Sequence, residues 1–458
     1  MTNAQLDLTV KTLGPRTLAS PLGLSTERGD DVADYIRDEV RVLSAIEFSA
    51  GDEGKTLPSP QIPSFEKAGP RERIYFDPKK VTAAIVTCGG LCPGLNSVIR
   101  SMVMELHHGY GVRRILGVRY GYEGLNPAVG LAPLELEPKS VESIHRHGGS
   151  VLGSSRGAQE PAVMVDYLVE REIDVLFTLG GDGTQRGAHQ IQQEIERRGL
   201  KIAVVGVPKT IDNDIAFVDQ TFGFDTAVET ARTVLDGAHV EAHGARNGLG
   251  IVKLMGRDAG FIAAHASLAS GEVNFCLVPE VDFELDGEQG LFACLERRLR
   301  ARSHALVVVA EGCARTIARR LGKSDERDAS GNLRFGADGL DVGTYLRDAV
   351  KAHFKAKGVP LAVKYIDPSY TIRSVPPTAT DEIFCNRLAR NAVHAAMAGK
   401  TDVLIGRMHG VFTHAPLAVV TGQNKVIDPD RELWLSVLRS TGQPLMRSTE
   451  GRASSRPD

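Results

Sequence analysis

The sequence predicts an α/β protein with two domains, each built on a mostly parallel sheet. Short, continuous apolar runs of strand length recur from residue 81 onward, and stretches with helical spacing separate them. Strands that are apolar on both faces are typical of parallel sheets covered by helices on each side. Glycine-rich breaks follow several of these runs, and ligands bind beyond the carboxyl ends of strands in such sheets.

The first set of predicted elements defines a domain over residues 76–235. Its strands are expected at residues 81–87, 113–120, 173–180 and 201–208. Helical spacing over residues 97–108 and 185–198 supplies two of the helices between them.

A second set predicts another α/β domain over residues 236–445, with part of its C-terminal segment returning to the first domain. Its strands are expected at residues 247–256, 273–280, 303–312 and 361–367. Residues 1–75 lack a sustained period and are predicted to form an N-terminal extension, and residues 446–458 a tail.

Composition narrows the class of function. The formal net charge of −3 leaves no excess of positive charge for a nucleic-acid backbone. No apolar stretch approaches the roughly 18 residues of a membrane span, and the first residues lack the apolar core of a signal peptide. The spacing of the six cysteines fits neither a disulfide framework nor a zinc site. We therefore expect a cytoplasmic protein that binds neither nucleic acid nor membrane.

The stretch "LGGDGT" places one carboxylate, Asp182, among Gly180, Gly181 and Gly183 after an apolar strand. Glycines let backbone N–H groups approach a phosphate closely, because no Cβ blocks the way. A carboxylate would repel the phosphate unless it holds Mg²⁺, which bridges the two. The alternative interpretation is an ordinary surface turn, which also favours glycine and aspartate.

The stretch "PKTIDND" offers Lys209, Thr210, Asp212 and Asp214 after another apolar strand. If the backbone is extended there, Thr210 and the two aspartates point to one side, which is costly unless they serve a site. The alternative is a capped helix start with Asx turns. Arg156 and Arg257 each follow an apolar run beside glycine and are candidate phosphate ligands, whose planar guanidinium groups can bind two oxygens at once.

Seven motifs appear together in order: "TCGGLCPGLN", "LGSSRG", "LGGDGT", "PKTIDND", "KLMGRDAG", "AEG" and "PSYTIRSVPPTATD". From about residue 80 to about residue 420 the chain thereby resembles the phosphofructokinase family. The resemblance implies two similar Rossmann-like domains with the active site in the cleft between them. It also implies transfer of a phosphoryl group to the 1-hydroxyl of fructose 6-phosphate, from ATP in most members and from pyrophosphate in some.

The resemblance assigns roles by motif. Asp182 would hold Mg²⁺, and the residues around the donor phosphates would be Gly89, Arg156, Gly157, Gly181, Gly183 and Thr184. Asp212 would be the general base, supported by Thr210 and Asp214, and an aspartate of ordinary pKa, about 3.9, is ionised at neutral pH. The residues around fructose 6-phosphate would be Thr210, Ile211, Asp212, Met255, Gly256, Arg257, Glu311, Tyr370 and Arg373, with the arginines at the 6-phosphate.

Two residues bear on the choice of donor. Pyrophosphate-using relatives carry an aspartate where this chain has Gly183, so Gly183 favours ATP, whereas Lys209 accompanies pyrophosphate use. We expect an ATP-dependent 6-phosphofructokinase of glycolysis, assembled as a homodimer or homotetramer. Short ATP-dependent relatives have a subunit-crossing arginine where this chain has Gly248, and Arg246 and Lys253 are candidates to replace it.

Three alternatives remain open. The first is a pyrophosphate-dependent enzyme of the same fold. The second is a lipid or NAD kinase, which shares "GGDGT" but is not expected to carry "PKTIDND" and "MGRDAG". The third is a non-catalytic regulatory subunit, which could lose either Asp182 or Asp212, although this chain has both.

Overall fold

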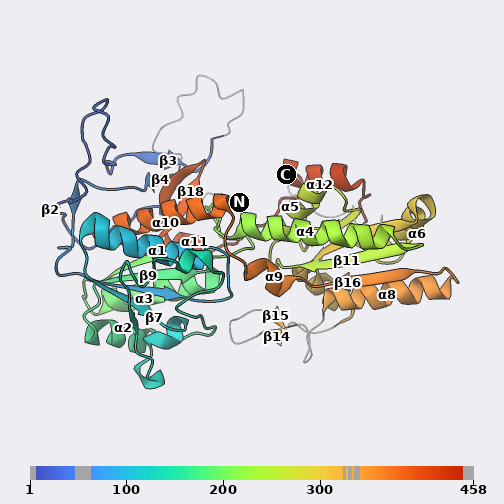
Figure 1. Cartoon of the computed structure of the whole chain (residues 1–458), viewed down its shortest axis with the longest axis horizontal. Coiled ribbons are helices and arrows are strands. Elements are labelled where there is room, and N and C mark those ends of the chain that lie inside the picture. The colour runs from blue at the N-terminus through green and yellow to red at the C-terminus, as the bar shows by residue number, and fades with distance from the viewer. Residues whose placement is uncertain (1–6, 47–62, 323–325, 328–332, 335–340, 447–458) are drawn as a thin grey trace. The chain divides into compact units, whose positions relative to one another are not determined.

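The computed structural model describes residues 7–46, 63–322, 326–327, 333–334 and 341–446 of the 458-residue chain. Contacts divide the chain into two compact units (Figure 1). Unit 1 comprises residues 1–211, 215–223 and 374–424, and unit 2 comprises residues 212–214, 224–373 and 425–458. The domain bounds expected from the sequence stay predictions, and the expected tail, residues 446–458, lies outside the described residues except for Met446.

Unit 1 is built on a nine-stranded sheet in the order β3-β4-β19-β18-β10-β9-β6-β7-β8. The five strands from β18 to β7 are parallel, and β3, β4, β19 and β8 run antiparallel to their neighbours. The strands are β3 (Arg41–Leu43), β4 (Ser64–Lys67), β6 (Thr82–Thr87), β7 (Arg114–Val118), β8 (Leu134–Glu135), β9 (Val175–Gly180), β10 (Ala203–Pro208), β18 (Val403–Met408) and β19 (Val411–Pro416).

Helices cover both faces of this sheet, because the connections that follow the central strands β6 and β9 run toward opposite edges of the sheet. β6 is followed by α1 (Leu95–Met104) and then β7, whereas β9 is followed by α3 (Asp182–Arg197) and then β10, on the other side. Right-handed crossovers in opposite directions place these two helices on opposite faces. α1 packs against α10 (Ala379–Met397), and α3 packs against α2 (Pro161–Glu170) and α11 (Leu417–Val420).

A π-helical segment, η2 (Glu105–Tyr110), continues α1, and three short 3₁₀ helices follow: η3 (Gly121–Leu125), η4 (Pro127–Val129) and η5 (Ile144–Arg146). Every residue of β6, β9 and β10 is buried, which explains their uninterrupted apolar sequences.

Unit 2 is built on a four-stranded, entirely parallel sheet in the order β12-β13-β11-β16. The strands are β11 (Gly248–Leu254), β12 (Phe275–Leu277), β13 (His304–Ala310) and β16 (Ala362–Ile366). The helices of the unit are α4 (Phe224–His243), α5 (Phe261–Ser270), α6 (Leu291–Arg302), η6 (Glu311–Cys313), α7 (Ala314–Arg320), α8 (Val342–Ala356), α9 (Ser369–Arg373) and α12 (Glu432–Thr441). The short strands β14 (Glu326–Arg327) and β15 (Leu333–Arg334) pair with each other. The two units together confirm the predicted α/β class with mostly parallel sheets. None of the described helices is both long and apolar enough to cross a membrane.

The described part of the N-terminal extension belongs to unit 1 and is held there by short strands. β1 (Lys11–Thr12) pairs with β17 (Lys400–Thr401), and β3 and β4 extend the large sheet beyond β19. Within the extension, β2 (Leu18–Ala19) pairs with β5 (Arg73–Ile74).

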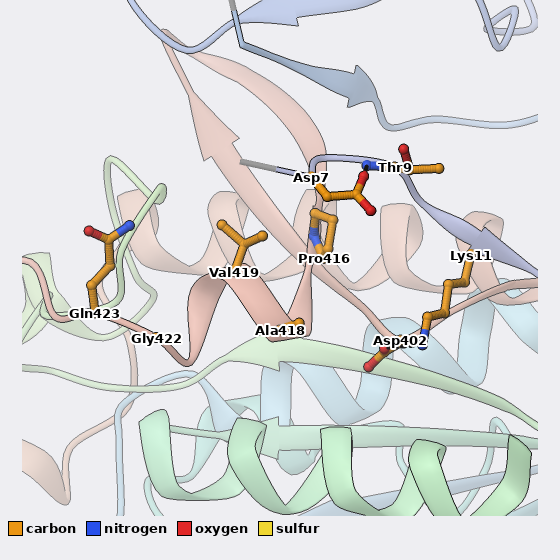
Figure 2. Close-up of a pocket in the computed structure, with 9 residues that line it drawn as sticks. All are labelled: Asp7, Thr9, Lys11, Asp402, Pro416, Ala418, Val419, Gly422 and Gln423. Carbon is orange, nitrogen blue, oxygen red and sulfur yellow. Dashed lines mark hydrogen bonds and ion pairs between the residues drawn. The ribbon is translucent and has the colours of Figure 1, made fainter. Parts of the chain in front are cut away.

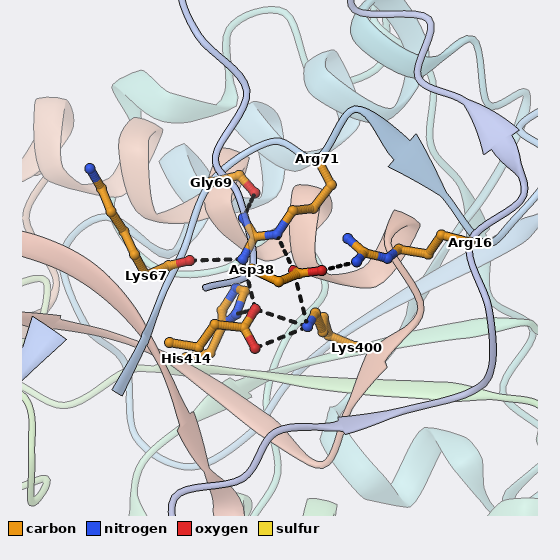
Figure 3. A network of polar contacts seen from close by, with 8 residues as sticks. Arg16, Asp38, Lys67, Gly69, Arg71, Lys400 and His414 are labelled. Atoms are coloured by element: carbon orange, nitrogen blue, oxygen red, sulfur yellow. Dashed lines mark hydrogen bonds and ion pairs between the residues drawn. The ribbon is translucent and has the colours of Figure 1, made fainter. Parts of the chain in front are cut away.

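A buried ionic network holds this extension in place (Figure 3). The guanidinium of Arg71, only 2% exposed, donates to Asp38 at 2.8 Å and to Glu66 at 2.7 Å. Asp38 also binds Arg16, and Lys400 pairs with Glu66 at 2.9 Å. Because each charge has a partner of opposite sign, residues 16 to 38 are anchored to β4 and β17.

Candidate active site

The predicted donor residues lie in unit 1, where the chain order of the large sheet reverses. β6 and β9 are parallel neighbours, yet the chain proceeds from them in opposite directions. The carboxyl ends of two such strands form the usual ligand-binding crevice of an open parallel sheet. Gly89 follows β6 at this edge, and Gly181 and Asp182 follow β9.

Backbone hydrogen bonds join the glycine-rich segments at this edge. The N–H of Gly89 donates to the carbonyl of Ser155 at 3.0 Å, next to Arg156, and the N–H of Lys209 donates to Gly180 at 3.0 Å. The buried ammonium of Lys209 donates to the carbonyl of Gly90 at 2.5 Å. Gly89, the Arg156–Gly157 loop, Gly181 and Lys209 are therefore brought together, and the side chain of Arg156 is exposed.

Asp182 is the first residue of helix α3, which begins three residues earlier than the helical spacing predicts. Gly180 allows this tight start, since a Cβ there would lie 2.1 Å from Oγ1 of Thr184. Thr184 is itself buried, and its carbonyl accepts from the hydroxyl of Tyr122 at 2.6 Å. A helix N-terminus presents unbonded N–H groups and a positive dipole end, which favour a phosphate.

The carboxylate of Asp182 forms an ion pair with Arg186, one helical turn later, at 2.8 Å. The sequence analysis missed Arg186, although its spacing of four residues on a helix was a readable signal. The Asp182 side chain is 26% exposed, so it remains accessible to an ion. Mg²⁺ is usually held by one or two carboxylates together with water and substrate phosphates. One accessible carboxylate beside a helix N-terminus fits that requirement.

Gly183 is the second residue of α3, and a Cβ at this position would meet no atom within 4 Å. Its φ lies outside the range that favours glycine. Within a helix, glycine is destabilising by about 1 kcal/mol relative to alanine. Neither packing nor backbone conformation in the described residues therefore requires a glycine at this position.

Four of the predicted sugar residues lie in unit 2, at the carboxyl edge of the four-stranded sheet: Met255, Gly256, Arg257 and Glu311. β11 leads into Met255, Gly256 and Arg257, and β13 leads into Glu311. Because Leu254 pairs in register with Ala310, the two loops leave the sheet side by side.

Two glycines allow these loops to approach each other. The N–H of Gly312 donates to the carbonyl of Gly256 at 2.8 Å. A Cβ on Gly312 would lie 2.2 Å from the carbonyl oxygen of Arg257, and Gly256 has a φ of 125°. Any side chain at either position would separate Arg257 from Glu311 or strain the backbone.

The backbone around Asp212 differs from the extended segment considered in the sequence analysis. Ile211 and Asp212 form a turn, and Asn213 adopts a left-handed φ of 56°, which asparagine tolerates better than most residues. Thr210, on the other side of the turn, has its carbonyl bonded by the hydroxyl of Thr221 at 2.6 Å. Asp212, Asn213 and Asp214 belong to unit 2, whereas Thr210 and Ile211 belong to unit 1.

The pKa of Asp212 lies well above the ordinary aspartate value, which corrects the sequence expectation of an ordinary carboxyl. Burial is the main cause, and the nearby carboxylates of Asp214 and Glu311 raise the pKa further. The backbone N–H of Arg257 and the charge of its guanidinium oppose this effect. A raised pKa makes Asp212 a stronger base once it has lost its proton.

Tyr370 and Arg373 lie on the short helix α9, which follows β16 at the same edge of the sheet. The guanidinium of Arg373 stands 4.9 Å from the centroid of the Tyr370 ring, whose residue is 76% exposed. Ile372 between them is fully buried and fixes the helix to the unit.

The structure also shows the surroundings of Gly248, the position at which short ATP-dependent relatives have a subunit-crossing arginine. A Cβ at Gly248 would lie 2.0 Å from the carbonyl oxygen of Ala242, so no side chain fits there without movement. Lys253 is engaged inside unit 2 with Asp341 and Asp367. Arg246 is exposed.

A separate cavity of about 470 Å³ lies in unit 1 where the N-terminal extension meets β19 and α11 (Figure 2). Lys11 on its wall pairs with Asp402 at 3.0 Å and with Glu196 at 2.9 Å. The residues lining it are Asp7, Thr9, Lys11, Asp402, Pro416, Ala418, Val419, Gly422 and Gln423, and none of them belongs to the predicted site.

Residues 82–396 match the family model described as phosphofructokinase. Because this match covers more than half of the chain, the protein belongs to the phosphofructokinase family. Two bacterial relatives are similar over nearly their whole length, and both are named ATP-dependent 6-phosphofructokinase. The protein from Borreliella burgdorferi is 45% identical and covers 97% of this chain and 98% of its own. The protein from Amycolatopsis methanolica is 48% identical and covers 96% of this chain and 95% of its own.

Solved structures support the fold independently. The pyrophosphate-dependent phosphofructokinase from Marinobacter aquaeolei superposes with a TM-score of 0.64 at 21% identity, covering 81% of this chain and 94% of its own. Phosphofructokinase from Saccharomyces cerevisiae superposes with a TM-score of 0.58 at 23% identity, covering 75% of this chain and 45% of its own. At such low identity the likeness concerns the fold alone.

Proposed function

We propose that this protein is an ATP-dependent 6-phosphofructokinase, which phosphorylates the 1-hydroxyl of fructose 6-phosphate to give fructose 1,6-bisphosphate in glycolysis. The observation that carries the proposal is the grouping of Asp212 with Asp214, Arg257 and Glu311 in unit 2, which places a carboxylate of raised pKa beside a guanidinium group. The near full-length relatives named for this activity support it.

The predicted donor residues of unit 1 would bind the triphosphate of ATP through backbone N–H groups and through side chains. The first N–H groups of α3 and the glycine segments at Gly89 and Gly181 would receive the phosphate oxygens, with Arg156 and Lys209 as counter-charges. Asp182 would hold Mg²⁺, which supplies positive charge to the transferring phosphoryl group when it is bound.

The acceptor half would bind and activate the sugar. Arg257 and Arg373 would bind the 6-phosphate, and Glu311, Met255 and Tyr370 would orient the ring. Asp212, once deprotonated, would accept the proton of the 1-hydroxyl as the oxygen attacks the phosphorus atom. Positioning accounts for much of the catalysis in this class of reaction, because the protein itself forms no covalent bond.

The competing function is the pyrophosphate-dependent reaction on the same sugar, which Lys209 favours. A coupled assay with fructose 6-phosphate, Mg²⁺ and either ATP or pyrophosphate separates the two. Turnover with ATP and none with pyrophosphate supports the proposal. Turnover with pyrophosphate alone supports the competing function, and turnover with neither rejects both.

We further propose a cytoplasmic homodimer or homotetramer. Sedimentation of the purified protein measures its assembly, and a monomeric active enzyme would contradict this part of the proposal.

Replacing Asp182 by alanine is expected to lower kcat by about 10²-fold or more, because the metal that neutralises the donor phosphates is lost. The fold should survive, since a first-turn carboxylate contributes only about 0.3–1 kcal/mol to a helix. A Mg²⁺ titration of activity measures the effect. If the variant retains the wild-type dependence on Mg²⁺, Asp182 is only a turn residue.

Replacing Arg257 or Arg373 by alanine is expected to raise KM for fructose 6-phosphate by roughly tenfold or more, because a charged hydrogen bond to the phosphate is lost. Arg347 is a matched control, because it pairs only with its neighbour Asp348 among the described residues. Steady-state kinetics should show Arg347→Ala unchanged. Equal use of fructose and fructose 6-phosphate by the wild type would contradict the assignment.

A further inference from the structure

Lys253 is an unusual residue for its place in the fold. It lies on β11, the second central strand of the four-stranded sheet, in an otherwise apolar stretch that leads directly to Met255 and Arg257. Its side chain is only 13% exposed. Removing an ammonium group from water is costly unless the charge is paired and hydrogen-bonded.

Two aspartates from different elements pair with Lys253. Its ammonium group lies 2.7 Å from Oδ2 of Asp367, and it also forms an ion pair with Asp341. Although burial alone would lower the pKa of Lys253, the hydrogen bonds that its ammonium group donates to Asp341 and Asp367 raise this pKa above its usual value. Lys253 is therefore a permanent cation that joins three chain segments.

The bond to Asp367 reaches the sugar-binding helix α9. Val252 and Ile366 are paired in register, so Lys253 and Asp367 are the next residues along two neighbouring strands. The other oxygen of Asp367 accepts from the backbone N–H of Ser369 at 3.1 Å and from the hydroxyl of the same residue. Asp367 thus forms an Asx turn that starts α9, the helix of Tyr370 and Arg373.

The bond to Asp341 leads to a different element. Asp341 is the N-cap of α8, where its Oδ1 accepts from the backbone N–H of Thr344 at 2.6 Å and from the hydroxyl of Tyr365 at 2.9 Å. Helix α8 carries none of the predicted sugar residues. Lys253 therefore has two possible roles: it could position α9 through Asp367 or anchor α8 through Asp341. Substituting each aspartate in turn tests these roles separately.

We propose that Lys253 is a positioning residue for fructose 6-phosphate, which acts through Asp367 to hold α9 in register with the Arg257 loop. The proposal rests on the proposed function, in which Arg257 and Arg373 bind the same phosphate. A phosphate gripped by arginines from two loops requires both loops at a fixed spacing, and small displacements of binding groups have large effects on affinity and rate. Lys253 supplies the one ion pair among the described residues that links β11 to the start of α9.

The test compares Lys253→Met, Asp367→Asn and the matched control Asp341→Asn. We expect Lys253→Met and Asp367→Asn each to raise KM for fructose 6-phosphate by roughly three- to thirtyfold, with KM for the phosphoryl donor unchanged. The double variant should be no worse than either single variant, because both remove the same link. Lys253→Arg should restore most of the affinity, since it keeps the charge.

Asp341→Asn should lower the melting temperature, because Lys253 loses one of its two carboxylate partners although asparagine still caps α8. It should leave KM for fructose 6-phosphate close to that of the wild type. If it raises this KM as much as Asp367→Asn, the cluster acts through general stability and the proposal is wrong. A normal KM in Lys253→Met also rejects it. The experiment also separates this proposal from the proposed function. A wild-type enzyme that does not phosphorylate fructose 6-phosphate rejects the function itself. An active wild type in which Arg373→Ala raises KM for fructose 6-phosphate and Lys253→Met does not rejects only the positioning role.

Discussion

Asp212→Asn is expected to lower kcat by about 10²-fold or more while KM for fructose 6-phosphate stays near the wild-type value. Asparagine keeps the size of the side chain and its hydrogen bond from the backbone of Arg257, but it cannot accept the proton of the sugar hydroxyl. The measurement is steady-state kinetics with saturating donor, and it should give a fall in kcat without a matching rise in KM.

The same substitution is expected to raise thermal stability at neutral pH. The pKa of Asp212 is higher in the folded protein than in the unfolded chain, so the folded state gains stability as the pH falls and this group protonates. Above that pKa, the ionised carboxyl destabilises the fold, and asparagine removes the charge. A higher melting temperature in an inactive variant would show that the lost turnover is not misfolding.

The pH profile supplies the control for this prediction. Activity requires the deprotonated base, so kcat/KM falls as the pH falls through the pKa of Asp212, at a higher pH than for an ordinary aspartate. Asp214→Asn removes one of the carboxylates that raise this pKa and should move the acidic limb to lower pH. Near-normal turnover in Asp212→Asn, or an unmoved limb in Asp214→Asn, would rule out Asp212 as the base.

Much of the fold could be predicted because the parallel strands are buried on both faces. The eight strands expected from apolar runs are found as β6, β7, β9, β10, β11, β12, β13 and β16, with ends shifted by a few residues. The strands β18 and β19 were not singled out, although the run "VLIG" in β18 is as apolar as the others. The place of β18 beside β10 depends on contacts between residues some 200 positions apart, which a local pattern does not encode.

The sequence predicts which residues belong to the candidate site, but not how these residues contact one another. The sequence supplies Asp212 and Glu311 as separate motifs, and the effect of Glu311 on the pKa of Asp212 emerges only when unit 2 is folded. The sequence analysis named Lys253 only as a candidate to replace the missing arginine, because its partner Asp367 is not recognisable until the two residues are folded beside each other. The turn at Ile211 and Asp212 replaces the extended backbone considered in the sequence analysis, because the residues of this segment are compatible with either geometry.

Gly183→Asp is expected to abolish most ATP-dependent activity while fructose 6-phosphate binding is retained. We propose that residue 183 faces the α-phosphate of ATP, where a carboxylate would add like charge. At about 4 Å and an effective dielectric constant near 20, two like charges repel by about 4 kcal/mol, and 1.4 kcal/mol already corresponds to roughly tenfold in affinity. The ratio of kcat/KM for ATP to that for pyrophosphate is the quantity to measure.

The structure makes this substitution a clean test, because nothing lies within 4 Å of a Cβ at Gly183 and the fold should accept the new side chain. An aspartate in the first turn of α3 also suits the positive end of the helix dipole. Gly183→Ala is the matched control: it adds a Cβ without charge and should retain ATP use, with the fold more stable by about 0.5–1 kcal/mol. If the aspartate and alanine variants lose ATP activity equally, bulk and not charge decides the donor. If Gly183→Asp uses ATP as well as the wild type does, residue 183 does not face the α-phosphate, and the choice between donors depends on other residues, with Lys209 the first to test.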